Sequence, residues 1–361
     1  MIIDKVAFFQ ELRNRETKII EIFNQERYRQ SFKPETLGQA VYSYISRPAK
    51  RLRPGILLFC CGAVGGREEQ ALYAATAVEV YHTWTLVHDD VIDNDRKRRG
   101  EPTVHEEFRI KALDWGYSEQ AAAELGRNVA ILTGDLQHAW SIRLLLDSLE
   151  TGVSPKVILD LTQRFESEVT TGLVEGEALD VLFAQRKITD LSEDEIIRML
   201  ELKTGVLYEF AGIAGASIGL GQTAAENQLI QNIGRFSRRC GIAFQLQDDV
   251  LGIVGDEKLL GKPVGSDIRE GKRTIIVLHA YEQADVAERR FLEKHLGNPA
   301  ISDQDLQKIK EILLEYNGIE YTRSLAESII SDAIRELDPL PNSRYKDLLL
   351  TWAQYIIDRD F

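Results

Sequence analysis

Apolar residues recur at intervals of three and four along nearly the whole chain, which is the spacing of one face of an α-helix. No segment alternates apolar and polar positions as a half-buried β-strand does. The pattern predicts helical segments over 5–30, 35–45, 55–64, 68–91, 118–149, 157–185, 192–220, 226–253, 275–281, 303–316, 318–337 and 343–358. We therefore expect an all-α protein, with residues 1–361 folded as a single large helical bundle around a central cavity.

A cluster of carboxylates stands at the end of the expected helix over 68–91. Asp89, Asp90 and Asp93 follow one another there, and the basic run 96–99 comes directly after them. On a helix, Asp89 and Asp93 share one face, with Asp90 beside them. Carboxylates packed this closely repel one another unless a cation lies among them, and hard divalent ions such as Mg²⁺ prefer oxygen ligands. The alternative is a solvated acidic helix end beside a basic loop.

The expected helix over 226–253 carries a second acidic pair, Asp248-Asp249, in apolar surroundings. Gln245 precedes the pair by three and four residues, so all three side chains share one face. Two adjacent carboxylates in a buried helix are costly for folding, which favours a functional reason for them. Cations follow this pair as well, at Lys262, Lys272 and Arg273.

Further basic residues stand where they would meet an anion. Lys50 and Arg53 come just before an apolar helix, whose first backbone N–H groups would also face a bound anion. Arg98 and Arg99 present guanidinium forks that match phosphate oxygens. Lys203 lies in an apolar segment, where an unpaired ammonium group is costly. The alternatives are a solvated linker for the first pair and a lysine that extends its ammonium group to water at position 203.

Composition and charge narrow the classes of function. The 361 residues include 44 basic and 57 acidic side chains, a formal charge of −13, which argues against broad nucleic-acid binding. The three cysteines fit a reducing compartment, and their spacing does not match a zinc site. The N-terminus lacks a signal-peptide pattern, and no run of 18 apolar residues occurs. We therefore expect a cytoplasmic protein without a transmembrane segment.

The two acidic pairs share a setting, because each lies near the C-terminal end of an apolar helix and precedes a cationic loop. Antiparallel helices would bring the pairs face to face across a cavity, with metal ions between the carboxylates and Lys and Arg side chains at the rim. Such a cage suits a diphosphate. The apolar helices below it suit a hydrocarbon tail.

Taken in order, these motifs resemble the trans-isoprenyl diphosphate synthases of the polyprenyl synthetase family. The resemblance runs from about residue 35 to the end of the chain. It rests on Lys50-Arg51-Leu52-Arg53-Pro54, Asp89-Asp90-Val91-Ile92-Asp93, Arg98-Arg99-Gly100, Lys203-Thr204-Gly205, Phe244-Gln245, Asp248-Asp249 and Gly261-Lys262.

The resemblance implies an isoprenoid-synthase type of helical fold, a homodimer, and the head-to-tail condensation of isopentenyl diphosphate with an allylic diphosphate. It implies about three Mg²⁺ ions per active site, held by oxygen ligands. The metal ligands would be Asp89, Asp90, Asp93, Asp248 and Asp249. Isopentenyl diphosphate would contact Lys50, Arg53, His82 and Arg99, and the allylic diphosphate would contact Arg98, Lys203 and Lys262. The catalytic residues would be Lys203, Thr204 and Gln245, of which Thr204 and Gln245 would lie beside the reacting carbons.

Two positions depart from the pattern of the family. The second acidic motif commonly has a third Asp, and Gly252 stands at that position here. This leaves open whether a metal ligand is missing. In addition, Arg47-Pro48-Ala49 replaces the usual glycine pair before Lys50, so the backbone shape of that segment is not predicted by the family.

Product length depends on the aromatic residues that precede the first acidic cluster. Trp84 lies five residues before Asp89, and Tyr81 lies eight before it. We interpret both as the floor of the tunnel for the growing hydrocarbon chain, which favours geranylgeranyl diphosphate slightly over farnesyl diphosphate. The absence of an insertion between Asp90 and Asp93 also resembles the geranylgeranyl-forming type. A farnesyl diphosphate synthase or a longer-chain polyprenyl synthase is the alternative.

Two readings from other classes remain. A class I terpene cyclase shares the metal-binding acids and the helical fold, but it has no second diphosphate to occupy Lys50, Arg53 and Arg99. A non-catalytic subunit of a heteromeric synthase would be expected to lose one acidic motif, and both are present.

Overall fold

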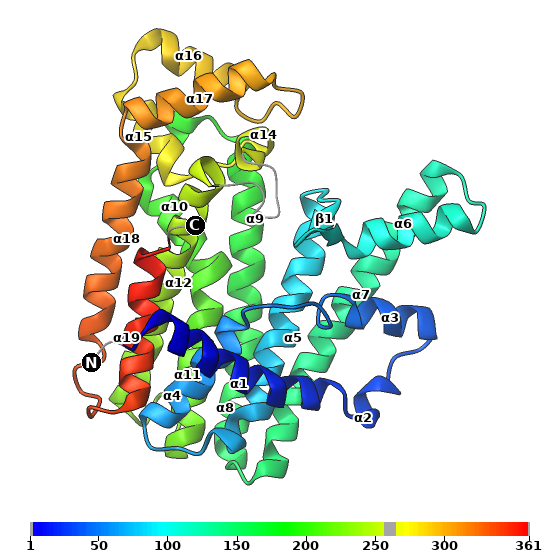
Figure 1. The fold of residues 1–361 in the computed structure, drawn as a ribbon, viewed down its shortest axis with the longest axis vertical. Coiled ribbons are helices and arrows are strands. Elements are labelled where there is room, and N and C mark those ends of the chain that lie inside the picture. Colours follow the sequence, from blue (N-terminus) through cyan, green and yellow to red (C-terminus); the bar gives the residue numbers. More distant parts are fainter. Residues whose placement is uncertain (1–2, 256–264, 360–361) are drawn as a thin grey trace. The chain divides into compact units, whose positions relative to one another are not determined.

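Helices are the dominant elements of the computed structural model, which describes residues 3–255 and 265–359 (Figure 1). This confirms the predicted all-α class. The contacts divide the chain into two compact units, each built from three segments. The first unit contains Met1–Thr162, Ile213–Ile230 and Asn342–Leu348, and the second contains Gln163–Gly212, Gln231–Pro341 and Leu349–Phe361. The expected single domain over 1–361 remains a prediction.

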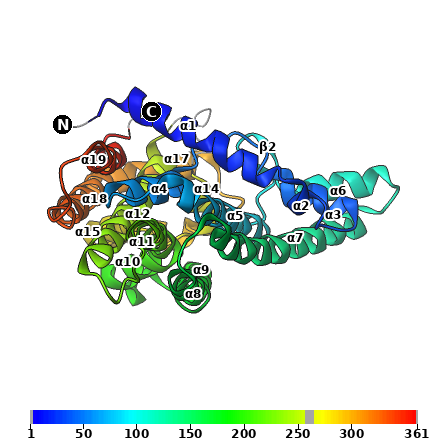
Figure 2. The same cartoon turned by 90° about the horizontal axis from the view of Figure 1, so that it is seen from below.

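The first unit is organised around two long helices, α5 and α7, which pack along each other (Figure 1). Gly134 on α7 leaves space for a side chain of α5, and Gly126 on α7 allows a close approach of α6, which lies beside α7 (Figure 2). Its helices are α1 (Lys5–Phe23), α2 (Glu26–Arg29), α3 (Glu35–Ser43), α4 (Leu52–Ala63), α5 (Glu68–Ile92), α6 (Val104–Asp114), α7 (Glu119–Asp147), η1 (Ser148–Thr151) and most of α8 (Pro155–Arg164).

A short hairpin follows α5 in the first unit, where the sequence predicted only a loop. Strand β1 (Lys97–Arg98) pairs antiparallel with β2 (Glu101–Pro102). The two connecting residues, Arg99 and Gly100, have φ angles of 54° and 82°, as a tight two-residue hairpin turn requires. Strands of two residues are too short to produce a detectable alternation in the sequence.

The second unit contains two π-helical turns inside segments that were predicted as continuous α-helix. They are η2 (Phe165–Thr170) and η4 (Glu201–Gly205), and π turns are frequent at functional sites. The other elements are α9 (Thr171–Gln185), η3 (Ile188–Asp190), α10 (Glu193–Leu200), the start of α11 (Val206–Leu220), most of α12 (Gln228–Val254), α14 (Ser266–Glu270), α15 (Ile275–Gln283), α16 (Val286–His295), α17 (Asp303–Glu315), α18 (Gly318–Arg335) and the second half of α19 (Arg344–Ile357).

Helices occupy the predicted ranges, but α6 at Val104–Asp114 and α16 at Val286–His295 lie outside all of them. The first helix ends at Phe23 instead of continuing to residue 30, and α4 begins at Leu52, so Arg53 lies in its first turn. The Ser192–Glu195 capping box is present as its spacing indicates. Among the described residues, none of the helices is both long enough and apolar enough to span a membrane.

Candidate active site

The first acidic cluster lies at the C-terminal end of α5. The helix ends at Ile92, and the backbone N–H of Asp93 donates to the carbonyl of Asp89 over 2.8 Å. Asp89 and Asp93 are therefore one helical turn apart, as their spacing predicts, and both are partly exposed.

Asp90 is buried, unlike Asp89 and Asp93, and protein groups bind both of its oxygens. Arg98 Nε lies 2.7 Å from Asp90 Oδ1 and 2.9 Å from Oδ2, and the hydroxyl of Tyr44 also donates to Oδ2. The carboxylate is only 1% exposed. Asp90 therefore holds a guanidinium in this structure, so a role as metal ligand would require this ion pair to rearrange.

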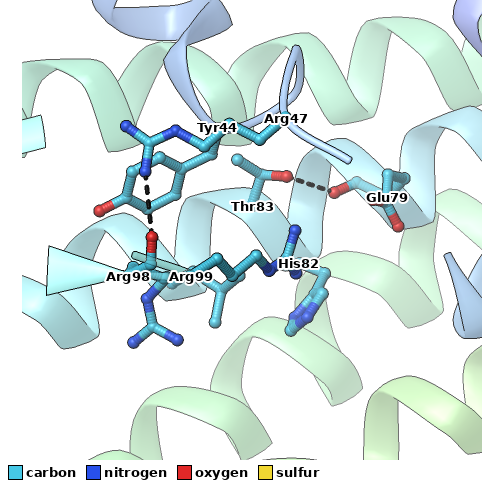
Figure 3. A pocket seen from close by; sticks show the side chains of 8 residues that line it. Tyr44, Arg47, Glu79, His82, Thr83, Arg98 and Arg99 are labelled. Carbon is cyan, nitrogen blue, oxygen red and sulfur yellow. Dashed lines mark hydrogen bonds between the residues drawn. The ribbon is translucent and has the colours of Figure 1, made fainter. Parts of the chain in front are cut away.

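A basic pocket adjoins this cluster within the first unit (Figure 3). Arg98, Arg99 and His82 lie on one side of it, and Tyr44 and Arg47 lie on the other. The lining residues are Tyr44, Arg47, Glu79, His82, Thr83, Leu86, Arg98 and Arg99.

The structure brings together residues predicted for both diphosphates, with Arg98 from the allylic site and the others from the isopentenyl site. His82, Arg98 and Arg99 line the pocket, and Arg53 joins them through a contact of 3.0 Å from Nη1 to His82 Nε2. Lys50 is exposed and is not among the lining residues.

Sequence reasoning did not assign Arg47 to the site. It belongs to Arg47-Pro48-Ala49, the segment that replaces the usual glycine pair of the family. The residue with a left-handed backbone conformation near this segment is Arg51, whose φ angle is 45°. Pro48 and Ala49 therefore keep negative φ angles and need no glycine.

His82 is held neutral in the pocket. Burial lowers its pKa well below the usual value, and the positive charges of Arg53, Arg99 and Arg98 lower the pKa further. A neutral imidazole accepts the hydrogen bond from Arg53 at Nε2, whereas a charged one would repel three guanidinium groups.

We expect the free energy of unfolding to decrease as pH falls below about 6.5, because unfolded His82 then takes up a proton that folded His82 excludes. The contribution of His82 is fully present above that pH and is lost toward the lowered folded pKa. His82→Gln keeps an acceptor for Arg53 and should lose less stability between about pH 7.5 and pH 5.5 in urea unfolding. His279→Gln, at a ring that stacks on Tyr321, is the control. Equal losses in His82→Gln and the wild type would contradict this prediction.

The two predicted floor residues lie together in an aromatic cluster. The indole N–H of Trp84 donates to His88 Nδ1 over 3.1 Å, and the Trp84 ring centroid lies 4.6 Å from that of His138 and 4.8 Å from that of Tyr81. Gly134 on α7 leaves the space for His88, because a Cβ there would lie 2.1 Å from His88 Nε2. Trp84 is thus held in one orientation, while Tyr81 lies fully buried beneath it.

In the second unit, the π turn η4 positions the predicted catalytic residues. Thr204 Oγ1 donates to Gln245 Oε1 over 3.1 Å, and Gln245 Nε2 donates to Asp249 Oδ1 over 3.1 Å. The Lys203 ammonium lies 2.6 Å from both Glu177 and Asp180 on α9. The ion pairs explain how this lysine is accommodated in an apolar segment.

Asp249 lies beside a carboxylate that sequence reasoning did not single out, Asp267 on α14. Burial raises the pKa of Asp249 well above its usual value, and the charge of Asp267 raises the pKa further. A Cβ on Gly252 would lie 2.8 Å from Asp267 Oδ2. The carboxylate of Asp267 therefore occupies the space next to the position where the family commonly has its third Asp.

The carboxylate of Asp248 forms an ion pair with an arginine of the same unit. Its Oδ1 lies 2.6 Å from Arg359 Nη1, and the Arg359 guanidinium also lies 4.3 Å from the ring centroid of Phe244. Both acidic motifs thus contain a carboxylate bound to a guanidinium. Buried or crowded carboxylates that attract cations in this way are a donor set that fits a hard divalent metal ion.

The described residues do not form a complete metal cage. Within 3–255 and 265–359, no three acidic, histidine or cysteine side chains converge closely enough to hold a metal ion. The predicted diphosphate ligand Lys262 lies outside the described residues.

Comparison with known proteins places this arrangement in a family. The model of the polyprenyl synthetase family matches residues 34–313. The chain is 35% identical to a geranylgeranyl diphosphate synthase of Saccharolobus solfataricus, covering 90% of this chain and 91% of the relative. It is 33% identical to a geranylfarnesyl diphosphate synthase of Aeropyrum pernix, covering 91% and 96%.

A solved structure shares the fold. The geranylgeranyl pyrophosphate synthase from Corynebacterium glutamicum, complexed with isoprenyl diphosphate and magnesium, superposes with a TM-score of 0.85 at 26% identity, covering 99% of this chain and 100% of that one. The motifs, the helical fold and the extent of these matches agree with one another, and the chain belongs to the polyprenyl synthetase family.

Proposed function

We propose that the protein is a prenyltransferase that condenses isopentenyl diphosphate head-to-tail with an allylic diphosphate, with geranylgeranyl diphosphate as its main product. The observation that carries this proposal is the pocket formed by Arg98, Arg99 and neutral His82 beside Asp89 and Asp93. Guanidinium forks bind a diphosphate through paired hydrogen bonds. The neutral histidine accepts a hydrogen bond from Arg53 and thereby orients that guanidinium.

The acidic residues serve a divalent metal in this proposal. Asp89, Asp93, Asp248 and Asp249 would hold about three Mg²⁺ ions together with substrate oxygens, and Asp90 would join them if it released Arg98. Bound Mg²⁺ supplies positive charge that stabilises the departing diphosphate. Asp267 is a further candidate ligand, since its carboxylate lies where Gly252 lacks a side chain.

The second unit supplies groups for the reacting carbons. The oxygens of Thr204 and Gln245 carry partial negative charge and are oriented by their mutual hydrogen bond. Oriented dipoles of this kind stabilise the positive charge that develops on the allylic carbon after its bond to the diphosphate breaks. The double bond of isopentenyl diphosphate then attacks this carbon, and the released diphosphate accepts the proton that is lost.

The assay that tests the proposal uses the purified protein, Mg²⁺, radiolabelled isopentenyl diphosphate and each allylic starter in turn. We expect chain extension from farnesyl diphosphate and geranylgeranyl diphosphate as the main product in chromatography. A protein that fails to extend every starter would refute the enzymatic role. Cyclic hydrocarbons formed without isopentenyl diphosphate would instead identify a terpene cyclase.

We also propose a cytoplasmic homodimer, as the family resemblance implies. Exposed apolar side chains on a long helix support a surface for a second copy of the chain, because covering apolar area in an interface is favourable. On α7 these side chains are Ile131, Leu132 and Leu146.

A further inference from the structure

Tyr44 connects three elements around the first acidic cluster. It follows the last residue of α3 and is only 5% exposed. Its hydroxyl donates to Asp90 Oδ2 on α5 and accepts from the backbone N–H of Val104, at the start of α6, over 3.2 Å. A phenol hydroxyl has one proton to donate and lone pairs to accept with, so it can serve both partners at once.

Asp90 connects Tyr44 to Arg98. The carboxylate accepts from Arg98 Nε at both of its oxygens, over 2.7 and 2.9 Å, and Arg98 Nη2 lies 2.5 Å from Oδ1. Because Tyr44 holds Oδ2, the carboxylate plane is fixed, and the guanidinium plane that pairs with it is fixed as well. Without the hydroxyl, a buried acceptor would lose a partner and the carboxylate would rotate more freely.

Arg47 holds the backbone that carries Arg98. Its Nη1 donates to the carbonyl of Arg98 over 3.4 Å (Figure 3). Its Nη2 donates to the carbonyl of Pro102 over 2.8 Å, so Arg47 contacts both strands of the hairpin. Its guanidinium lies 4.7 Å from the ring centroid of Tyr44. Arg47 stands in the segment that replaces the usual glycine pair, where neither glycine nor alanine would make these hydrogen bonds.

We propose that Tyr44 and Arg47 are positioning residues for Arg98. Tyr44 orients the Arg98 guanidinium through Asp90, and Arg47 orients the hairpin from which Arg98 extends. Asp90 then acts in catalysis through Arg98 as well as through its charge. The inference rests on the proposed function, since it takes Arg98 as a ligand of the allylic diphosphate.

The test is Tyr44→Phe, which removes the hydroxyl and keeps the ring under Arg47. We expect the KM for the allylic diphosphate to rise about tenfold, with the KM for isopentenyl diphosphate changed less than about twofold, because one buried hydrogen bond is lost. Calorimetry with inorganic pyrophosphate and Mg²⁺ should show a similar loss of affinity. Arg47→Gln, which retains an amide donor, should change both quantities in the same direction by a smaller factor.

Tyr42→Phe is the matched control, since this neighbouring buried hydroxyl donates to the carbonyl of Phe23 and not to the acidic cluster. It should leave both KM values unchanged. A Tyr44→Phe protein with a lower Tm and wild-type KM and pyrophosphate affinity would overturn the inference, because Tyr44 would then serve the fold alone. Wild-type protein without chain extension would refute the proposed function, whereas the pyrophosphate titration would still decide the role of Tyr44.

Discussion

Replacing Asp248 with alanine is expected to reduce kcat at least about a hundredfold, the scale seen when one group that stabilises transition-state charge is removed. The carboxylate is one of the two acids of the second motif, and alanine cannot hold a divalent cation. The fold should survive, because the Asp248 side chain is 36% exposed and its partner Arg359 retains the Phe244 ring. Surface changes of this kind cost about 0.5 kcal/mol or less.

The measurement is kcat across a Mg²⁺ titration, with thermal unfolding as the check on folding. Asp89→Ala should behave in the same way, since Asp89 belongs to the first motif. Asp358→Ala is the matched control, because this exposed carboxylate binds Gln354 and lies outside both motifs. A mild loss in Asp248→Ala, close to that of Asp358→Ala, would mean that the metal ligands are wrongly assigned.

Asp267→Asn tests whether the carboxylate next to Gly252 takes the place of the third Asp that the family commonly has there. If Asp267 contributes to metal binding, the Mg²⁺ affinity measured by calorimetry in the presence of pyrophosphate should fall roughly tenfold, as for groups that support a metal site. The amide is the same size as the carboxylate, so packing against Gly252 is preserved. Unchanged Mg²⁺ affinity would leave the second motif with two acids only.

Trp84→Ala is expected to lengthen the product by at least one isoprene unit, so that chains beyond geranylgeranyl diphosphate dominate. Removing the indole leaves a space lined by Tyr81 and His138, into which a longer hydrocarbon tail can extend. Trp84 is the better choice for this test, because Tyr81 is fully buried and its truncation would cost about 3–5 kcal/mol of stability.

Chromatography of the products formed from farnesyl and geranylgeranyl starters provides the measurement. Trp84→Phe serves as the matched control: it keeps one aromatic ring in the space and loses the second ring of the indole, with the N–H that donates to His88. Its main product should remain geranylgeranyl diphosphate. If Trp84→Ala also gives the wild-type product length, Trp84 is not the floor of the tunnel.

Helical periodicity predicted most of the secondary structure, because an amphipathic helix repeats the same demand on residue type every turn. The helix predicted over 68–91 is α5, Glu68–Ile92, and the Ser192–Glu195 capping box begins α10. The π turn at Glu201–Gly205 was not predictable, because the helix that follows, Val206–Leu220, is buried on almost all sides. In such a segment the phase shift from one inserted residue leaves no visible change in the apolar pattern. The β1–β2 hairpin was not predicted because its strands have two residues each, too few to show an alternation of apolar and polar positions.

The candidate site was predictable only in part. Spacing along α12 places Gln245 and Asp249 on one face, and their hydrogen bond confirms that they meet. By contrast, Tyr44, Arg47 and Asp267 entered the site through contacts with segments far away in the sequence. Each is a common residue type with no local signal, so only the packed structure identifies it.

The sequence by itself determined the helical class, the two acidic motifs and the cations that accompany them, because these depend on residue type and local spacing. Only the tertiary structure decided which carboxylate is bound to which cation. It pairs Asp90 with Arg98 and Asp248 with Arg359, and it places Asp267 beside Gly252. The physical reason is that an ion pair depends on distance and burial, which are set by the packing of segments distant in the chain.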